Sequence, residues 1–282
     1  MTAVISCIDG SPSSAAVCDY SAWASVRLAA PLTLVHILEE TPQVPTDFTG
    51  SIGLGSREHL LQELAELDEK RGRLAREHGQ HLLDAAKHRL DRLGIMHPKA
   101  LQRHGNLVDS LKEMEDDIRL LVIGRQGEQS GSLFEHIGGH VENVIRTLHR
   151  PVLVVPTDFA MPQRFLIAFD GSANGRRVVE RLVQSPLLKS LDCHLLMVGE
   201  PSAEQQAQLD WATSQLQQAG YTTYSKTCQG EVEDALESYC QDQLISLLVM
   251  GAYGHSRIRQ FLVGSTTTNM LRRAKLPLLM LH

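Results

Sequence analysis

The sequence predicts an α/β protein made of two tandem domains, each with a parallel sheet covered by helices on both faces. Short, continuous apolar runs alternate with stretches of helical periodicity, a pattern typical of parallel strands that are buried on both faces. The same order of runs occurs twice along the 282 residues. Each copy therefore has about 140 residues, the usual size of a domain with one core.

The first copy begins with an apolar strand at Ala3, which leads into the acidic turn Asp9-Gly10-Ser11. The elements expected after it are a helix over 15–29, a strand over 32–38, a strand over 120–124 and a proline-led strand over 151–155. The second copy repeats this order with a strand from Phe165 into the turn Asp170-Gly171-Ser172. Its expected elements are a helix over 175–183, a strand over 194–198, a strand over 247–251 and a proline-led strand over 277–281.

Landmark residues keep nearly the same spacing in the two copies, which identifies a duplication. The shift is 125 residues from Gly105 to Gly230, and 126 residues from Pro151 to Pro277. We place the domains at 1–156 and 164–282, joined by a proline-flanked linker over 157–163. The first copy is 36 residues longer in its middle region. There we expect a loop over 41–56 and a long charged helix over 57–93.

Composition argues against several classes of protein. The chain is 43% hydrophobic and 21% charged, and its formal net charge of −6 differs from the basic excess of a general nucleic-acid binder. No apolar run reaches the roughly 18 residues that a membrane-spanning helix needs, and residues 1–9 lack the basic start of a signal peptide. We therefore expect a cytoplasmic protein without a nucleic-acid or membrane partner. Its five cysteines form no C-x-x-C, and we expect Cys7, Cys18 and Cys240 to be buried thiols.

A glycine-rich segment in the second copy has the character of a phosphate-binding loop. It runs from Gly251 to Thr266 with the spacing G-x2-G-x9-G-S, between the end of a strand and the start of a helix over 267–274. Glycines allow the backbone to approach an anion, and the start of a helix presents unpaired N–H groups and a positive dipole. Ligands of parallel α/β sheets bind at the carboxyl ends of the strands, where this loop and Asp170 are both expected.

With these residues in place, the whole chain resembles the universal stress protein family in its tandem form. The resemblance is carried by the Asp-Gly-Ser turns at 9–11 and 170–172, by Val-Met-Gly-Ala-Tyr-Gly at 249–254, and by Gly-Ser-Thr at 264–266. It implies a five-stranded parallel sheet of order 3-2-1-4-5 in each domain and the binding of ATP, or of ADP or AMP, with Mg²⁺ carried by the phosphates. Asp170 would contact the adenosine, the Val198 backbone the adenine edge, and Gly251 the ribose. The phosphates would be held by Gly254, Gly264, Ser265 and Thr266.

The first copy departs from this pattern in its phosphate loop. Gly138 matches Gly264, but Gly139 and His140 replace the two hydroxyl residues, and the spacing is ten residues instead of nine. Two carboxylates, Glu128 and Glu135, replace Arg257 and Arg259. Because carboxylates repel a polyphosphate, we expect the first copy to be empty or to bind something other than ATP.

Three functions remain open at this point. The protein is a nucleotide-binding stress-response or signalling protein, a slow ATPase or other nucleotide-dependent enzyme, or an interaction scaffold without nucleotide. No base, arginine finger or metal-binding carboxylate pair is evident near the loop, so no catalytic residue is assigned. A helix face with Glu77, His81, Asp84 and His88 is interpreted as a solvated charged face rather than a metal site.

The resemblance also concerns the last strands of the two copies, 151–155 and 277–281. Members of the family with one domain usually pair through this strand, and the duplication would allow one chain to do so internally. Both strands are short and apolar, and each leaves a sheet edge that needs a cover. A further pairing of two chains as a homodimer stays open.

Overall fold

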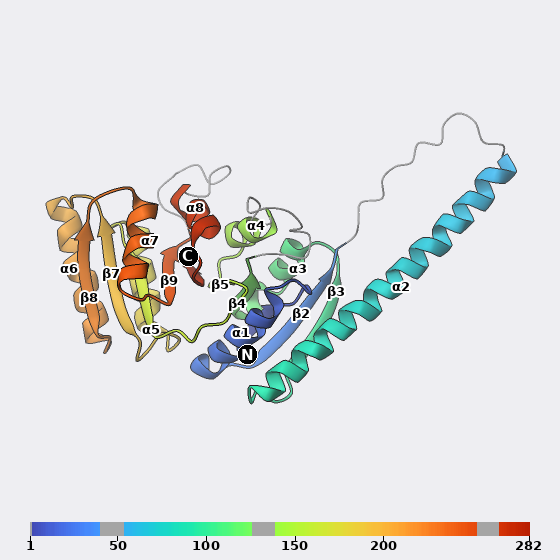
Figure 1. The fold of residues 1–282 in the computed structure, drawn as a ribbon, viewed down its shortest axis with the longest axis horizontal. Helices are drawn as coiled ribbons and strands as arrows, with labels where there is room; N and C mark the ends of the chain where they lie inside the picture. Colours follow the sequence, from blue (N-terminus) through green and yellow to red (C-terminus); the bar gives the residue numbers. More distant parts are fainter. Residues whose placement is uncertain (1, 40–53, 126–138, 253–264) are drawn as a thin grey trace.

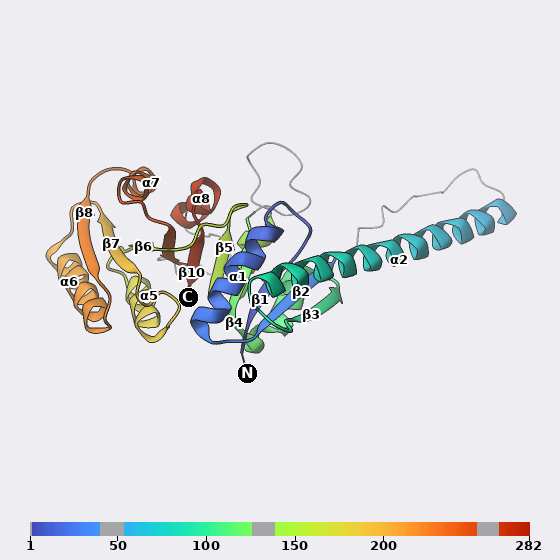
Figure 2. The ribbon, with the colours of Figure 1, turned by 60° about the horizontal axis from the view of Figure 1, so that its bottom comes forward.

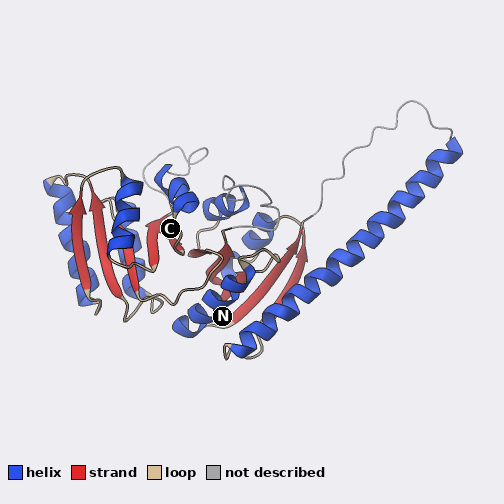
Figure 3. Ribbon diagram, viewed as in Figure 1, coloured by secondary structure: helices blue, strands red, loops and turns tan. Residues whose placement is uncertain are grey.

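The computed structural model describes residues 2–39, 54–125, 139–252 and 265–282. They form one ten-stranded sheet with helices on both faces, and a single long helix extends away from it (Figure 1; Figure 3). The first half contributes β1 (Ala3–Cys7), α1 (Ser14–Leu28), β2 (Leu32–Leu38), α2 (Leu54–Arg92), β3 (Lys99–His104), α3 (Leu107–Glu113), β4 (Ile118–Gly124), α4 (Gly139–Thr147) and β5 (Val152–Val155). The second half contributes β6 (Arg164–Ala168), α5 (Ala173–Gln184), β7 (Asp192–Val198), α6 (Ala203–Gln218), β8 (Thr223–Cys228), α7 (Val232–Asp242), β9 (Leu247–Gly251), α8 (Ser265–Arg273) and β10 (Leu278–Leu281).

The predicted strand order is confirmed. The sheet runs β3-β2-β1-β4-β5-β10-β9-β6-β7-β8, so each half has the order 3-2-1-4-5 when it is followed from its outer edge. Neighbouring strands within a half are parallel. The first strand of each half is central, and all five residues of β1 are buried. Burial on both faces explains why such strands are continuous apolar runs in the sequence.

Helices cover the sheet in two layers, as Figure 2 shows. One core cluster contains residues of α1, α2, α5 and α6, and the other contains residues of α3, α4, α7 and α8. The two halves therefore place equivalent helices on the same face of the sheet. Within the described residues no helix is long and apolar enough to cross a membrane.

The outermost strands, β3 and β8, have no apolar run in the sequence. Their sequences are KALQRH and TYSKTC, and their side chains are mostly exposed or half-buried. An edge strand has a neighbour on one side only, so polar side chains are tolerated there and help to prevent edge-to-edge association. For this reason the third strand of each half could not be located from apolar periodicity.

The two halves meet at β5 and β10, which pair in antiparallel orientation. Leu278 lies opposite Val154, and Met280 lies opposite Val152. Contacts on both faces accompany this pairing. On one face the guanidinium of Arg27 donates to the carbonyl of Leu187 at 3.0 Å. On the other face Arg272 and Glu142 form an ion pair of 3.4 Å between α8 and α4.

Helix α2 accounts for most of the extra length in the first half. It has 39 residues, whereas its counterpart α6 has 16. The expected long helix is thus present, but the expected loop over 41–56 is wrong at its end because the helix begins at Leu54. The rest of that loop lies outside the described residues. The C-terminal part of α2 packs on the sheet, through Gly79 and through buried residues such as Leu83 and Leu90.

Candidate functional site

The sheet brings Asp170, Val198 and Gly251 to one edge. Val198 and Gly251 are the last residues of β7 and β9, and Asp170 lies two residues beyond the end of β6. Strand β6 pairs with both β7 and β9 in parallel. The carboxyl ends of the three strands therefore meet at the position where ligands of open α/β sheets bind.

The acidic turn after β6 holds the Asp170 carboxylate in a fixed position. Oδ1 of Asp170 accepts a hydrogen bond from the amide of Ser172 at 2.9 Å, and Gly171 takes a positive φ of 75° between them. Ser172 also caps α5, because its hydroxyl accepts from the amide of Gly175 at 3.1 Å. Among the described residues no hydrogen bond reaches Oδ2 of Asp170, which leaves this oxygen for a ligand hydroxyl.

Among the described residues, the backbone N–H and C=O of Val198 form no hydrogen bond beyond the end of β6. The carbonyl of Leu196 accepts from the amide of Phe169 at 2.9 Å, so the peptide groups of Leu196 face β6. Successive residues of a strand alternate in direction, and those of Val198 therefore face the same side, beyond the end of β6. This geometry suits recognition of the edge of a planar base.

Gly251 allows an additional side chain, that of Asn174, to reach this edge. A Cβ placed on Gly251 would lie 2.2 Å from Nδ2 of Asn174. Oδ1 of Asn174 accepts from Arg177 at 3.2 Å. Asn174 was not singled out from the sequence, although its place in the turn Asp-Gly-Ser-Ala-Asn-Gly would have been the signal.

The start of α6 closes the other side of the turn. Gln205 and Ser202 form a reciprocal capping box, which fixes the first turn of this helix. Nε2 of Gln205 donates to the carbonyl of Asp170 at 3.4 Å. The polar end of α6 thus borders the edge that carries Asp170.

The predicted phosphate contacts are only partly within the described structure. Gly254, Gly264 and the arginines at 257 and 259 lie outside the described residues. Ser265 is the first residue of α8, and Thr266 is half-buried beside it. The helix therefore begins two residues earlier than the expected 267, at the end of the glycine-rich segment.

The equivalent edge of the first half is occupied differently. Asp9 accepts two hydrogen bonds on Oδ1, from the amide of Ser11 at 3.0 Å and from the hydroxyl of Ser14 at 3.1 Å. Oε1 of Glu39, directly after β2, lies 3.4 Å from Nδ1 of His140 at the start of α4. The matching Glu200 of the second half instead accepts from Gln229 at 2.9 Å. A carboxylate thus lies beside the start of α4 in the first half.

Helix α2 also packs closely at this edge of the first half. His36 is buried on β2, and its Nδ1 is 2.7 Å from the carbonyl oxygen of Ile8. A Cβ on Gly79 of α2 would lie 2.4 Å from Cδ2 of His36. A Cβ on Gly10 would lie 3.2 Å from the side chain of Leu82. The first half therefore places an apolar residue of α2 where the second half has Gln205.

The sequence also drew attention to a possible metal-binding helix face and to three cysteines. No cluster of three or more metal-ligating side chains occurs among the described residues. The carboxylate of Asp84 is bound by Lys87 at 3.1 Å, and this hydrogen bond lowers its pKa. Cys7, Cys18 and Cys240 are buried as expected, and burial raises their pKa to about 12. These thiols are protonated at neutral pH and are not nucleophiles.

Comparison with known proteins gives the family. Residues 1–156 and 161–282 each match the universal stress protein family. The universal stress protein Slr1230 of Synechocystis is 32% identical over 284 residues, which cover 99% of both chains. The chain belongs to the universal stress protein family. The similarity to the Synechocystis relative extends over both halves of this chain.

Solved structures agree on the fold of this universal stress protein. One from Archaeoglobus fulgidus has a TM-score of 0.71 at 17% identity and covers 99% of this chain and 97% of its own. One from Pseudomonas aeruginosa has a TM-score of 0.61 at 12% identity and covers 100% and 93%. Another universal stress protein, solved in complex with cAMP, is 28% identical and covers 44% of this chain with a TM-score of 0.38. Nucleotide is thus bound by that member of the family.

Proposed function

We propose that this universal stress protein binds one adenine nucleotide, ATP in the first instance, in its second half, and that the bound state serves as a signal in a stress response. The observation that carries the proposal is the meeting of Asp170, Val198 and Gly251 at one edge of the sheet. The glycine-rich segment that leads into α8 starts from the same edge. Each of these groups matches one part of an adenine nucleotide.

The proposed roles follow from the chemistry of the groups. Oδ2 of Asp170 accepts a hydrogen bond from a hydroxyl of the adenosine, and the peptide groups of Val198 pair with the adenine edge. The backbone of Gly251 contacts the ribose, with the amide of Asn174 packed beside it. Backbone amides at Gly254 and Gly264, with the hydroxyls of Ser265 and Thr266, hold the phosphates and any Mg²⁺ they carry. ADP and AMP share all contacts except those of the outer phosphates.

We further propose that the first half does not bind ATP. The Glu39–His140 pair places a carboxylate beside the start of α4. The hydroxyls of the second loop are missing, and each lost charge-assisted hydrogen bond weakens binding by about 1.5–3 kcal/mol, or roughly ten- to a hundredfold. We also propose that the two domains extend over residues 1–156 and 164–282.

Isothermal titration calorimetry with ATP and Mg²⁺ tests both halves of the proposal. The expected stoichiometry is one ATP per chain for the wild type. A variant with Gly264→Val and Ser265→Ala loses this binding. The matched variant in the first half, Gly138→Val with Gly139→Ala, keeps it. Two ATP per chain would contradict the asymmetry, and unchanged binding by the Gly264→Val, Ser265→Ala variant would place the site elsewhere.

Pairing of β5 with β10 uses the strand edges through which members of one domain associate. We propose that the two halves stay joined in this way in solution. Homodimer formation would then need another surface and stays a prediction, as does the cytoplasmic location. Size-exclusion chromatography with light scattering at several protein concentrations distinguishes a monomer from a dimer.

A further inference from the structure

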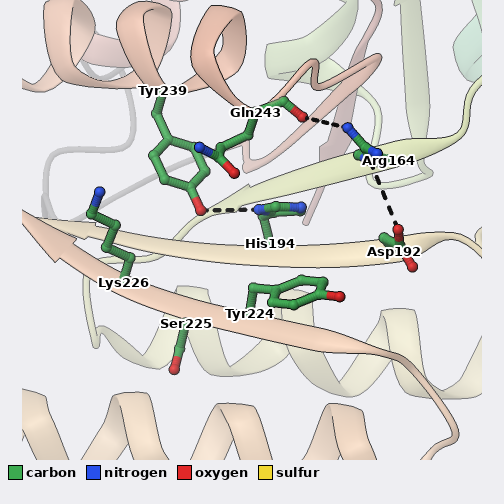
Figure 4. Close-up of a pocket in the computed structure, with 8 residues that line it drawn as sticks. All are labelled: Arg164, Asp192, His194, Tyr224, Ser225, Lys226, Tyr239 and Gln243. Atoms are coloured by element: carbon green, nitrogen blue, oxygen red, sulfur yellow. Dashed lines mark hydrogen bonds and ion pairs between the residues drawn. The ribbon is translucent and has the colours of Figure 1, made fainter.

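A second pocket lies at the opposite ends of the strands that carry the proposed nucleotide site. It has a volume of about 470 Å³ and opens on the face of the sheet that carries α7 (Figure 4). Its lining comes from the first residues of β6 and β7, from β8 and from α7. His194 of this pocket is four residues from Val198 along β7, which at about 3.3 Å per residue is about 13 Å.

Three aromatic rings form the wall of this pocket. His194 is only 6% exposed and lies between Tyr224, at a centroid distance of 5.1 Å, and Tyr239, at 5.7 Å. The hydroxyl of Tyr239 is 2.9 Å from Nδ1 of His194 and fixes the ring. Tyr224 is 52% exposed, so one part of the aromatic wall is open to a ligand.

The two cationic side chains of the pocket, Arg164 and Lys226, differ in their partners. Arg164 donates to the carbonyl of Gln243 at 3.1 Å and lies 3.8 Å from the carboxylate of Asp192. Lys226 has no carboxylate partner among the described residues. Its ammonium lies 5.7 Å from the centre of the Tyr239 ring. Figure 4 labels both side chains. One positive charge therefore remains available beside the aromatic wall.

This set of side chains is absent from the first half. The residues at the positions of His194, Tyr224, Lys226 and Tyr239 are, in that order, Thr33, Lys99, Leu101 and Met114. Both halves have the same fold, so the fold does not require three rings and an ammonium at this place. The two tyrosines, His194 and Lys226 at these positions therefore distinguish the second half from the first.

We propose that this pocket binds a small planar aromatic anion. The ring of the ligand lies against Tyr224 and Tyr239, and its acid group pairs with the ammonium of Lys226. A neutral ring lacks the ion pair, and a saturated anion lacks the ring contact. Both are therefore expected to bind less tightly than an aromatic acid.

Ligand-observed NMR on the full chain tests the proposal, with 2-naphthoate as the probe. The comparison ligands are 2-naphthamide, which is neutral, and cyclohexanecarboxylate, which has no aromatic ring. We expect 2-naphthoate to bind about tenfold or more tightly than the neutral amide, since a charge-assisted contact is worth roughly ten- to a hundredfold. It should bind about two- to tenfold more tightly than cyclohexanecarboxylate, which lacks the ring contact. Equal binding of the amide, or no saturable binding of 2-naphthoate, overturns the proposed ligand class.

Variants locate the bound probe. Lys226→Met is expected to weaken 2-naphthoate about tenfold or more, and Tyr224→Ala about two- to tenfold through the lost ring contact. Lys275→Met removes the same charge from an exposed position elsewhere and leaves binding unchanged. Wild-type affinity in both pocket variants overturns the assignment. A second result would also overturn it: ATP displaces the probe, and Lys226→Met weakens the binding of that ATP. The pocket would then be a second nucleotide site.

Discussion

Close packing of α2 against the sheet depends on the absence of a side chain at Gly79. Substitution Gly79→Ala would place a Cβ 2.4 Å from Cδ2 and 2.8 Å from Nε2 of His36, and 2.1 Å from Nε2 of Gln102. The end of Gln102 can turn aside. The His36 ring is buried and its Nδ1 is held 2.7 Å from the carbonyl oxygen of Ile8. The ring would need to move by roughly 1 Å to restore ordinary contact distances of about 3.5 Å.

Two opposing effects set the expected magnitude. Alanine in place of glycine favours the helix by about 0.8–1.0 kcal/mol. Overpacking a core costs about 1–3 kcal/mol, and loss of the His36 hydrogen bond costs about 1–3 kcal/mol more. We expect Gly79→Ala to lower the free energy of unfolding of the first half by about 1–5 kcal/mol. Gly72 provides the control because a Cβ there meets nothing within 4 Å. Gly72→Ala should increase helicity without this loss.

Tryptophan fluorescence in urea can follow each half separately. The chain has two tryptophans, Trp23 in α1 and Trp211 in α6. In a Trp211→Phe background, the remaining Trp23 reports unfolding of the first half, and circular dichroism at 222 nm reports helicity. If Gly79→Ala raised the midpoint of the Trp23 transition as a simple gain in helix propensity would, α2 would not lie against His36 as described.

Three further predictions follow from the described contacts. Arg125→Met should change the free energy of unfolding by less than about 1 kcal/mol. The cost of burying this guanidinium, which also lowers its pKa to about 10, offsets the gain from its 2.7 Å hydrogen bond to the carbonyl of Leu276. A loss above about 3 kcal/mol in urea unfolding would contradict this balance. Burial, and then Arg164, lower the pKa of His194 in the folded protein, so the unfolded state binds the proton more readily. The corresponding stability is present above the unfolded pKa of about 6.5 and decreases as the pH falls below it; His194→Asn should reduce this decrease in unfolding experiments between pH 7 and 5, and an unchanged pH dependence would argue against it. ATP turnover should stay below about 1 s⁻¹, because no group that would orient or deprotonate water was found in the sequence of the loop; a steady-state phosphate-release assay above that rate would reveal catalytic residues that were missed.

Much of the fold could be predicted because buried parallel strands have a strong sequence signal. The runs at 32–38 and 247–251 coincide with β2 and β9. This signal is missing in β3 and β8, the two edge strands, because most of their residues are polar. Helix limits shifted by one to three residues, since caps such as Ser172 depend on a tertiary turn rather than on periodicity.

Part of the candidate site could also be predicted, through the turn at Asp170 and the strand ends at Val198 and Gly251. Gln205 could not, because it reaches the site through the packing of α6 beside the turn. The turn sequence pointed to Asn174, but its close approach to Gly251 depends on the packing of α5. The Glu39–His140 pair joins residues 101 positions apart, and no local pattern relates them. The pocket around His194 likewise combines four elements that are distant in the sequence.

The sequence by itself determined the duplication, the class of fold and the difference between the two phosphate loops, since all three are written in local spacing and residue type. The resemblance to the family had already suggested that the last strands pair, but only the tertiary structure decided that this pairing is antiparallel and that α2 packs closely on the first half. The antiparallel pairing of β5 with β10 merges two sheets into one. In the first half, α2 packs at Gly79 directly against the side chain of His36. Both depend on contacts between surfaces that are far apart in the chain. Their energies come from burial and hydrogen bonding across those surfaces, and local periodicity carries no information about them.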